Sequence, residues 1–275
     1  MTLKWTTMLV AFLCVAGVRA EAIELGFDGQ FTQGGLVIGR TVPGAKVYVD
    51  GTPVRVSAAG DFVLGFGRDA AAEVKVRVTA PTGGSEVRKM AVQSREFKVQ
   101  RIDGLPPKQV TPDPEVVKRI TAESALIKAT RKIDTPTPHF KSGFVWPIQG
   151  VVSGVFGSQR ILNGKPRSPH SGVDIAAPRG AVVRASADGV ISLVHQDMYF
   201  TGKTVLIDHG FGLASVFIHM DEILVREGQK VAQGTPIGKV GATGRATGPH
   251  LHWGISLFQI RLDPSLAVPP MPSAK

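Results

Sequence analysis

The 275-residue sequence predicts a mainly β protein with an N-terminal antiparallel β-sandwich, a helical connector and a C-terminal antiparallel β domain. Three observations support this organisation. Residues 21–100 alternate polar and apolar positions between turn signals, prolines gather near positions 106 and 136, and glycine and β-branched residues dominate after Phe140. The length is sufficient for two domains.

Residues 1–20 have the pattern of a secretory signal peptide. Lys4 precedes an apolar run from Met8 to Val18, and Val18 and Ala20 are small residues at the positions that a signal peptidase reads. Because the run is shorter than the roughly 20 apolar residues that cross a bilayer, we expect cleavage and export; an uncleaved anchor is the alternative. The remainder divides into a sandwich domain at 21–100, a linker at 101–139, a C-terminal domain at 140–268 and a tail at 269–275.

The single cysteine, Cys14, lies inside that apolar run, so the processed chain is expected to contain no cysteine. This excludes thiol catalysis, structural disulfides and zinc sites built from cysteine, and leaves histidine and carboxylate as metal ligands. Removal of Lys4 and Arg19 lowers the formal net charge from +10 to +8. This charge indicates weak attraction to an anionic polymer, although a merely soluble surface explains it equally well.

Residues 21–100 repeat a short-strand pattern. The stretch AKVYVDGTPVRVSAAGDFVLGF indicates one pair of strands around an Asp50-Gly51 turn and a second pair around Gly60-Asp61. The stretch AEVKVRVTAPTGGSEVRKMAV repeats the pattern around a Gly-Gly turn. About seven short strands in this length are similar to bacterial immunoglobulin-like modules and predict a small antiparallel sandwich. The segment contains no histidine, so no chemistry is assigned to it.

A proline-rich connector follows the sandwich. Four prolines between positions 106 and 114 mark a boundary, and Asp113-Pro114-Glu115 is typical of a helix start. A loose apolar stripe then continues to about Ile133, and Pro136 and Pro138 close the segment. We favour a spacer, because a stripe of this kind usually packs on its own neighbours. The alternative is a connector that docks on the following domain and covers a groove.

From Phe140 onward the sequence predicts a second β domain. The expected strands are Val151–Phe156, Val182–Ala185, Gly189–His195, Thr204–Asp208, Leu213–His219, Ile237–Val240 and His250–Leu257. All seven histidines of the chain fall in this half. The chemistry of the protein is therefore expected here.

Two histidine motifs in this domain aim their side chains at one place. His250 and His252 flank a single leucine, and alternate residues of a strand share a face. In PHSGVDIAAP, Asp174 follows His170 by four residues, and the neighbouring proline and glycine favour an extended segment. His170, Asp174 and one imidazole of the pair would give a metal ion three ligands and leave a fourth tetrahedral position for water. Such an open site is a catalytic arrangement.

His219, at the end of LASVFIHM, is the third element. A lone histidine is usually a core or surface residue, and only the presence of the other histidine motifs makes His219 a candidate site residue. In this order, HSGVD, FIHM and GPHLHWGIS resemble the motifs of the lysostaphin-type (LytM-like) zinc metallopeptidases, which cut peptide cross-bridges in bacterial cell walls. The resemblance spans roughly Gly143 to Pro264, less than half of the chain, and identifies residues 140–268 as a zinc metallopeptidase domain.

The resemblance implies a role for five residues, none of which is replaced. It implies zinc ligands at His170, Asp174 and His252, and catalytic histidines at His219 and His250. Zinc held by one carboxylate and two neutral imidazoles lowers the pKa of bound water to about 7. The two other histidines suit proton transfer and stabilisation of an oxyanion, and the sequence does not divide these tasks between them.

The implied function is hydrolysis of peptide cross-links in peptidoglycan by a zinc endopeptidase of the periplasm. We expect no nucleic-acid partner and no stable membrane insertion, while the N-terminal domain offers a surface for a protein regulator. Two alternatives stay open: a non-catalytic wall-binding regulator of another hydrolase, and a zinc peptidase that acts on secreted proteins. The sequence contains neither the His-Glu-x-x-His zinc motif nor a Gly-x-Ser-x-Gly nucleophile turn. His209 is interpreted as a residue that stabilises a turn.

Overall fold

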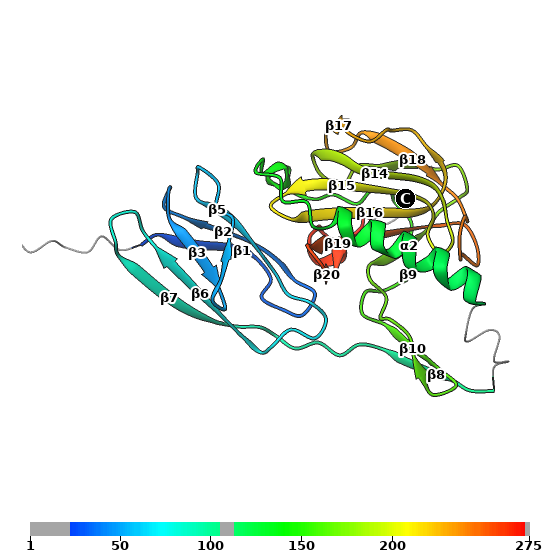
Figure 1. Cartoon of the computed structure of the whole chain (residues 1–275), viewed down its shortest axis with the longest axis horizontal. Helices are drawn as coiled ribbons and strands as arrows, with labels where there is room; N and C mark the ends of the chain where they lie inside the picture. Colours follow the sequence, from blue (N-terminus) through cyan, green and yellow to red (C-terminus); the bar gives the residue numbers. More distant parts are fainter. Residues whose placement is uncertain (1–22, 105–112, 273–275) are drawn as a thin grey trace, which may run out of the picture.

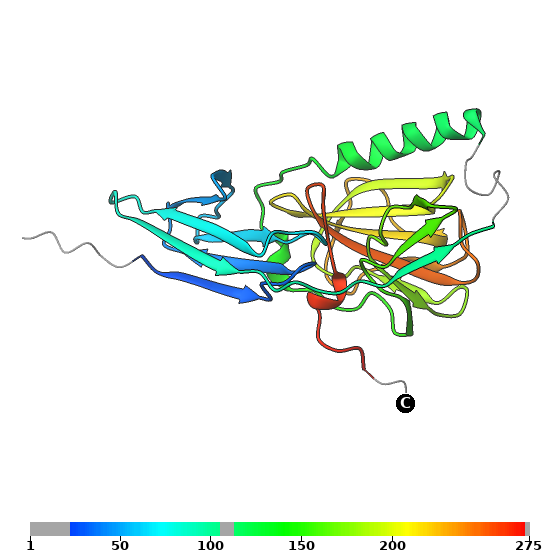
Figure 2. The ribbon, with the colours of Figure 1, turned by 90° about the horizontal axis from the view of Figure 1, so that it is seen from below.

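The computed structural model describes residues 23–104 and 113–272, so the predicted signal peptide lies outside the described residues. Figures 1 and 2 show a smaller β-rich part beside a larger one, with the helix α2 (Pro114–Thr130) lying across the larger part. The prediction of a mainly β protein with a C-terminal antiparallel sheet is confirmed. Within the described ranges, no helix is long and apolar enough to cross a membrane.

The N-terminal part is a sandwich of two antiparallel sheets. The first sheet contains β1 (Leu25–Gly29), β2 (Leu36–Thr41) and β5 (Asp61–Gly65), and the second contains β4 (Thr52–Val54), β3 (Lys46–Val49), β6 (Glu73–Thr79) and β7 (Ser85–Ala91). Period-two alternation explains the packing, because Val74, Val76 and Val78 of β6 point inward while their neighbours face solvent. These valines share a core with Phe62 of the facing sheet.

The sandwich docks on the C-terminal domain through apolar and polar contacts. Leu36 and Val63 of the sandwich belong to the same buried cluster as the core of the C-terminal domain. Beside them, a guanidinium nitrogen of Arg95 lies 2.9 Å from a carboxylate oxygen of the buried Asp263. Shared apolar burial and this ion pair hold the two parts together.

The C-terminal domain is built on one large sheet. Its strands follow the order β17-β14-β15-β16-β19-β12-β9, with β13 and β18 paired at one side and β20 on β19. They are β9 (Val151–Gly154), β12 (Val173–Ala176), β13 (Val182–Arg184), β14 (Gly189–Met198), β15 (Gly202–Gly210), β16 (Leu213–Ile223), β17 (Lys230–Val231), β18 (Pro236–Val240), β19 (His250–Leu257) and β20 (Ile260–Leu262). All these pairings are antiparallel.

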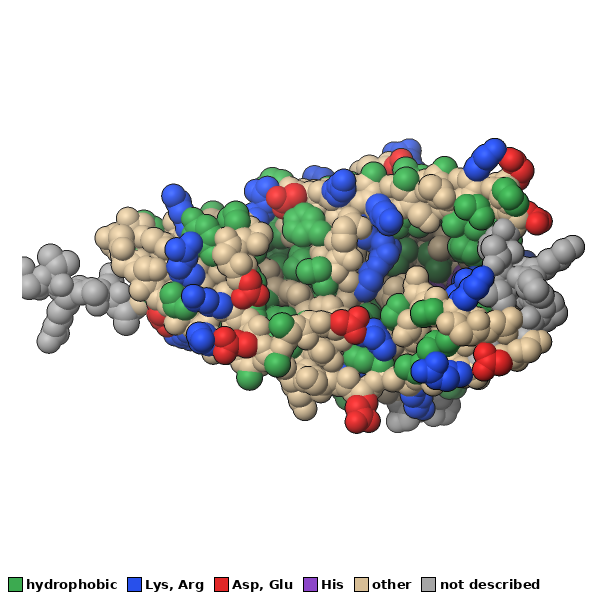
Figure 3. Space-filling model, turned by 60° about the horizontal axis from the view of Figure 1, so that its bottom comes forward, with side chains coloured by type: hydrophobic (Ala, Val, Ile, Leu, Met, Phe, Trp, Pro, Cys, Tyr) green, Lys and Arg blue, Asp and Glu red, His purple; other side chains and the backbone are tan. Residues whose placement is uncertain are grey.

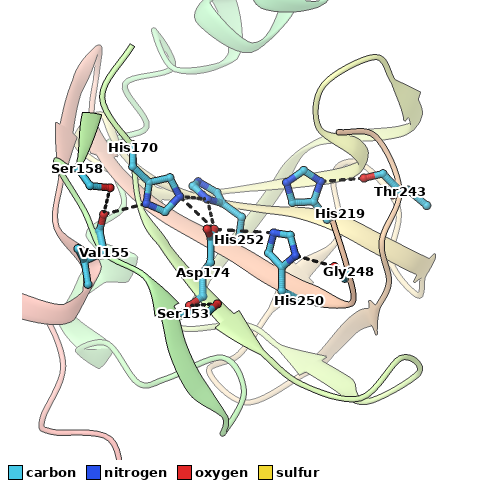
Figure 4. A network of polar contacts seen from close by, with 10 residues as sticks. All are labelled: Ser153, Val155, Ser158, His170, Asp174, His219, Thr243, Gly248, His250 and His252. Atoms are coloured by element: carbon cyan, nitrogen blue, oxygen red, sulfur yellow. Dashed lines mark hydrogen bonds and ion pairs between the residues drawn. The ribbon is translucent and has the colours of Figure 1, made fainter. Parts of the chain in front are cut away.

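The two faces of this sheet have different tasks. Leu251 and Trp253 of β19 point into the main core together with Ile175 of β12, and all three are fully buried. Alternation therefore turns His250 and His252 to the opposite face. The expectation that these two histidines share a face agrees with their placement on one side of the sheet in Figure 4.

The connector does not act as a free spacer. Its first part, β8 (Val99–Ile102), pairs in parallel with β10 (Gln159–Leu162), which forms a hairpin with β11 (Lys165–Pro166). This small sheet lies in the C-terminal domain rather than in the sandwich. Residues 99–102, around the predicted start of the linker at residue 101, therefore pair with a strand of the C-terminal domain.

The helix α2 also docks, on the sheet face that carries the histidines. Its Ile127 packs on a cluster of buried side chains from three strands, Leu193, Met198, Leu206, Val216 and Ile218. In the second half of the helix, Glu123 accepts a hydrogen bond from the backbone N–H of Tyr199 at 2.8 Å. The spacer interpretation is wrong because the strands expose an apolar strip on this face and Ile127 of the helix packs on it, although Val117 and Leu126 of the predicted stripe stay exposed.

His209 has a structural place inside the C-terminal domain. It is fully buried; its Nδ1 lies 2.6 Å from the carbonyl oxygen of Asp188 and its Nε2 lies 2.7 Å from Ser215 Oγ. Because a carbonyl only accepts, Nδ1 carries the proton and Nε2 accepts from the hydroxyl. Burial lowers the pKa of His209 to about 4, although its hydrogen bond to Asp188 opposes the shift.

We expect the free energy of unfolding to fall in acid because of His209. Its pKa is about 4 in the folded chain and about 6.5 when exposed, so the unfolded chain binds more protons between these values. The contribution is complete above pH 6.5 and is lost as the pH falls toward 4. Between pH 7 and 5 the loss is about 2 kcal/mol.

Urea unfolding of the metal-free protein at both pH values measures this loss. His209→Gln is the comparison, and it should lose less stability than the wild type over the same interval. Equal losses in the two proteins would contradict the assignment.

Candidate metal centre

A group of one carboxylate and four imidazoles lies on the open face of the large sheet (Figure 4). Asp174 comes from β12, His250 and His252 come from β19, and His219 comes from β16. His170 comes from the segment before β12. The structure therefore brings together all five residues singled out in the sequence, from places up to 82 positions apart in the chain.

Three of these residues converge on one point. Asp174 Oδ1 lies 3.1 Å from His170 Nε2 and 2.8 Å from His252 Nδ1, and the two nitrogens are 3.0 Å apart. The donors of a tetrahedral zinc ion with bonds of about 2.0–2.1 Å stand roughly 3.3 Å from one another. The triangle needs only a small expansion to hold such an ion. The donor set, two imidazoles and one carboxylate, also suits zinc.

A backbone carbonyl fixes the tautomer of His170. Its Nδ1 lies 3.0 Å from the carbonyl oxygen of Val155, which can only accept a hydrogen bond. Nδ1 therefore carries the proton in the neutral ring, and the lone pair of Nε2 points at the convergence point. Metal-binding histidines commonly use their second ring nitrogen in this way.

The electrostatics of the triangle favour a cation. Burial alone would raise the pKa of Asp174, but the neighbouring rings of His170 and His252 hold it well below its usual range. Burial lowers and the Asp174 carboxylate raises the pKa of His170, with a net increase, while burial lowers the pKa of His252. The carboxylate stays charged, and the centre attracts a proton or a metal ion.

His219 and His250 stand beside the triangle without joining it. Their ring centres are 4.8 Å apart, and the ring centre of His219 is 6.4 Å from that of His252. Each Nδ1 lies 2.8 Å from a backbone carbonyl oxygen, of Thr243 for His219 and of Gly248 for His250. Each Nδ1 therefore donates, which leaves both Nε2 atoms as acceptors.

His219 has an unusual backbone conformation. Its φ of 63° is in the left-handed region, which costs energy for a residue other than glycine. The pairing of β15 with β16 shifts register at this point, and the His219 backbone N–H donates to Thr201 O at 2.9 Å. Burial lowers the pKa of His219 to about 4, with its bond to Thr243 opposing, so the ring is neutral at pH 7.

Gly154 is a residue of this centre that the sequence analysis did not identify. A Cβ at Gly154 would stand 2.3 Å from Asp174 Oδ2, so a side chain there would displace the carboxylate. Glycine inside a strand is a known sign of such a close approach and could have indicated the position. The carbonyls that orient the histidines, those of Val155, Thr243 and Gly248, carry no signal in their side chains.

The chain is similar to known peptidases. The model of peptidase family M23 matches residues 168–264. Peptidoglycan DD-endopeptidase ShyA of Vibrio cholerae is 45% identical over 86 residues, which cover 31% of this chain and 20% of that protein. The DD-carboxypeptidase/endopeptidase Mpg of Neisseria meningitidis is 43% identical over 101 residues, covering 36% of this chain and 23% of that protein. The chain thus spans about a fifth of the length of these curated relatives.

A solved structure extends the likeness beyond the histidine domain. The crystal structure of a protein from Pseudomonas aeruginosa, assigned to peptidase M23, is 33% identical to this chain with a TM-score of 0.63. The match covers 86% of this chain and 94% of that one. The likeness therefore includes the N-terminal part as well as the sheet.

We expect Gly154→Ala to weaken the binding of zinc by about 10- to 100-fold, the range for groups that support metal ligands. The added methyl group would push Asp174 out of the triangle. Competition with a chromogenic chelator measures the affinity. Gly26→Ala is the matched control, because a Cβ at Gly26 meets nothing within 4 Å. An unchanged affinity in Gly154→Ala would show that the carboxylate is not a ligand.

Proposed function

The chain belongs to peptidase family M23, and from this membership and the geometry of the centre we propose that it is a zinc-dependent endopeptidase that hydrolyses peptide cross-links of bacterial peptidoglycan. The complete group of five side chains carries the proposal. His170, Asp174 and His252 are the proposed zinc ligands, and His219 and His250 are the proposed catalytic residues.

The completeness of the group argues against a non-catalytic regulator. A protein that only binds the cell wall has no need of a metal triangle, and still less of two further imidazoles with free Nε2 acceptors beside it. A role on secreted proteins would use the same centre. The names of the relatives, a peptidoglycan DD-endopeptidase and a DD-carboxypeptidase/endopeptidase, favour peptidoglycan as the substrate. Such a substrate implies action outside the cytoplasm, and we propose export through the signal peptide to the periplasm.

The residues of the centre have different proposed roles in hydrolysis, according to their positions. His170, Asp174 and His252 would hold a zinc ion that, when bound, would lower the pKa of water to about 7 and polarise the carbonyl of the scissile bond. Asp174 and the Nδ1–H bond from His170 to Val155 keep the donor atoms aimed at one point. The Nε2 of His250 stands 4.0 Å from Asp174 Oδ1, close enough to take a proton from a nucleophile held there.

His219 is also suited to proton transfer. Its neutral ring accepts a proton at Nε2, and the ring then donates that N–H to the oxyanion or to the leaving amine. The carbonyls of Thr243 and Gly248 prevent each ring from turning over, so the acceptor atoms stay directed at the substrate. Both histidines therefore begin as acceptors, and either can return the proton to the leaving group.

The proposed roles predict two classes of variant. His219→Ala should keep its zinc and lose activity by about 10²- to 10⁴-fold, since it removes proton transfer and leaves the ligands in place. His170→Ala and Asp174→Ala should lose both zinc and activity. Zinc content by atomic absorption, measured beside the hydrolysis rate, separates the classes. A His219→Ala protein with most of its activity would contradict the role of this residue.

The substrate is tested with purified peptidoglycan. We expect the mature chain to release soluble fragments with new amino groups, a chelator to stop the release, and added zinc to restore it. Mass spectrometry of the fragments identifies the bond that is cut. Binding to the wall without new amino groups would favour the regulator, and cleavage of a secreted protein with intact peptidoglycan would favour the other peptidase.

A further inference from the structure

A cavity of about 830 Å³ lies between the sandwich and the C-terminal domain. Residues 65–71 of the sandwich form one wall, and residues 168–171 with Ile260 and Arg261 form the other. His170 is the residue of the proposed zinc centre that belongs to this lining, so the cavity adjoins the centre at His170. Figure 3 shows a hollow on this side of the molecule, with hydrophobic side chains on its floor and Lys and Arg side chains along its edge.

Arg261 lies on the same face of the sheet as the zinc centre. In the pairing of β20 with β19, Arg261 stands opposite Ser256, which is four positions after His252 and therefore on its face. The next residue, Leu262, is fully buried in the core on the opposite face.

Arg261 is the charged side chain of this cavity without a partner among the described residues. The other charged side chains of the lining have partners: Asp50 accepts from Lys75 N, Arg68 donates to Gly157 O and to Asp69, Glu73 pairs with Lys89, and His170 belongs to the metal triangle. Burial without a compensating anion lowers the pKa of Arg261 to about 10. A half-buried guanidinium with its N–H donors unused is costly unless a ligand supplies acceptors.

We propose that Arg261 binds a carboxylate of the peptide substrate, and that the cavity between the two domains extends the substrate cleft from the zinc centre. This inference rests on the proposed function. The planar fork of a guanidinium fits a carboxylate with two parallel hydrogen bonds. Peptides of the cell wall carry free carboxylates, and one peptide that reaches both His170 and Arg261 would fill the cavity.

The proposal gives the sandwich a role in binding the substrate. Its residues 65–71 close the cavity opposite Arg261, and Arg68 fixes this wall by donating to Gly157 O at 2.8 Å. Phe66 and Phe156 contribute apolar lining to the same cavity, and apolar surroundings strengthen an ion pair formed beside them. The sandwich would thus position the substrate.

Two cross-linked stem peptides test the subsite, one with free carboxylates and one with the same carboxylates amidated. We expect the wild type to cleave the free form with a kcat/KM roughly 10- to 100-fold higher, mostly through KM, as for loss of a charged hydrogen-bonded pair. Arg261→Gln should lower kcat/KM for the free form by that factor and abolish the preference. Arg261→Lys should restore part of it, since the charge returns without the fork.

Arg226→Gln is the matched control, because it removes the same charge from an exposed residue outside the cavity. It should keep the preference of the wild type. Equal cleavage of both peptides by the wild type, or an equal loss on both in Arg261→Gln, would overturn the subsite while leaving the endopeptidase in place. Cleavage of neither peptide by the wild type would instead overturn the proposed function.

Discussion

The pairing of β12 with β19 is the constraint on which the centre depends. It sets Asp174 directly opposite His252, and residues opposed in this way hold their Cβ atoms about 4.5–5.5 Å apart. A slip of either strand by one residue would turn its ligand side chain into the core. Ile175 and Trp253, buried in the same two strands, prevent that slip. The hydrophobic core therefore places the donor atoms before any ion is bound. The positions of these atoms are as well defined as the pairing of the two strands.

Around this rigid pair, less regular segments supply the remaining parts. His170 comes from the approach to β12, and His219 from a register shift in β16 whose strained backbone is held by Thr201. The turn that contains Thr201 is itself supported by α2, since Glu123 binds the backbone of Tyr199 two residues earlier. The connector is thus linked to the backbone of His219 through two hydrogen bonds. A helix outside the segment matched by the family model thus contributes to the order of the candidate metal centre.

Alternation and spacing were sufficient to predict many of the strands and the candidate site residues. They did not predict the contacts between elements that are distant in the sequence. The pairs His250 with His252 and His170 with Asp174 follow from local periodicity, and so do the valines of β6. The pairing of β8 with β10 could not be predicted, because both strands are four residues long and their contact is non-local. The docking of α2 was misread for a related reason. The strip that it covers, which includes Val216 and Ile218, exists only after three strands have assembled.

The shared burial of Leu36 and Val63 affects how such a protein can be taken apart. A C-terminal fragment cut at the linker would expose the apolar surface that the sandwich had covered. We expect such a fragment to self-associate through this surface. A chimera that replaces the sandwich with another domain would need a new apolar contact to cover this surface.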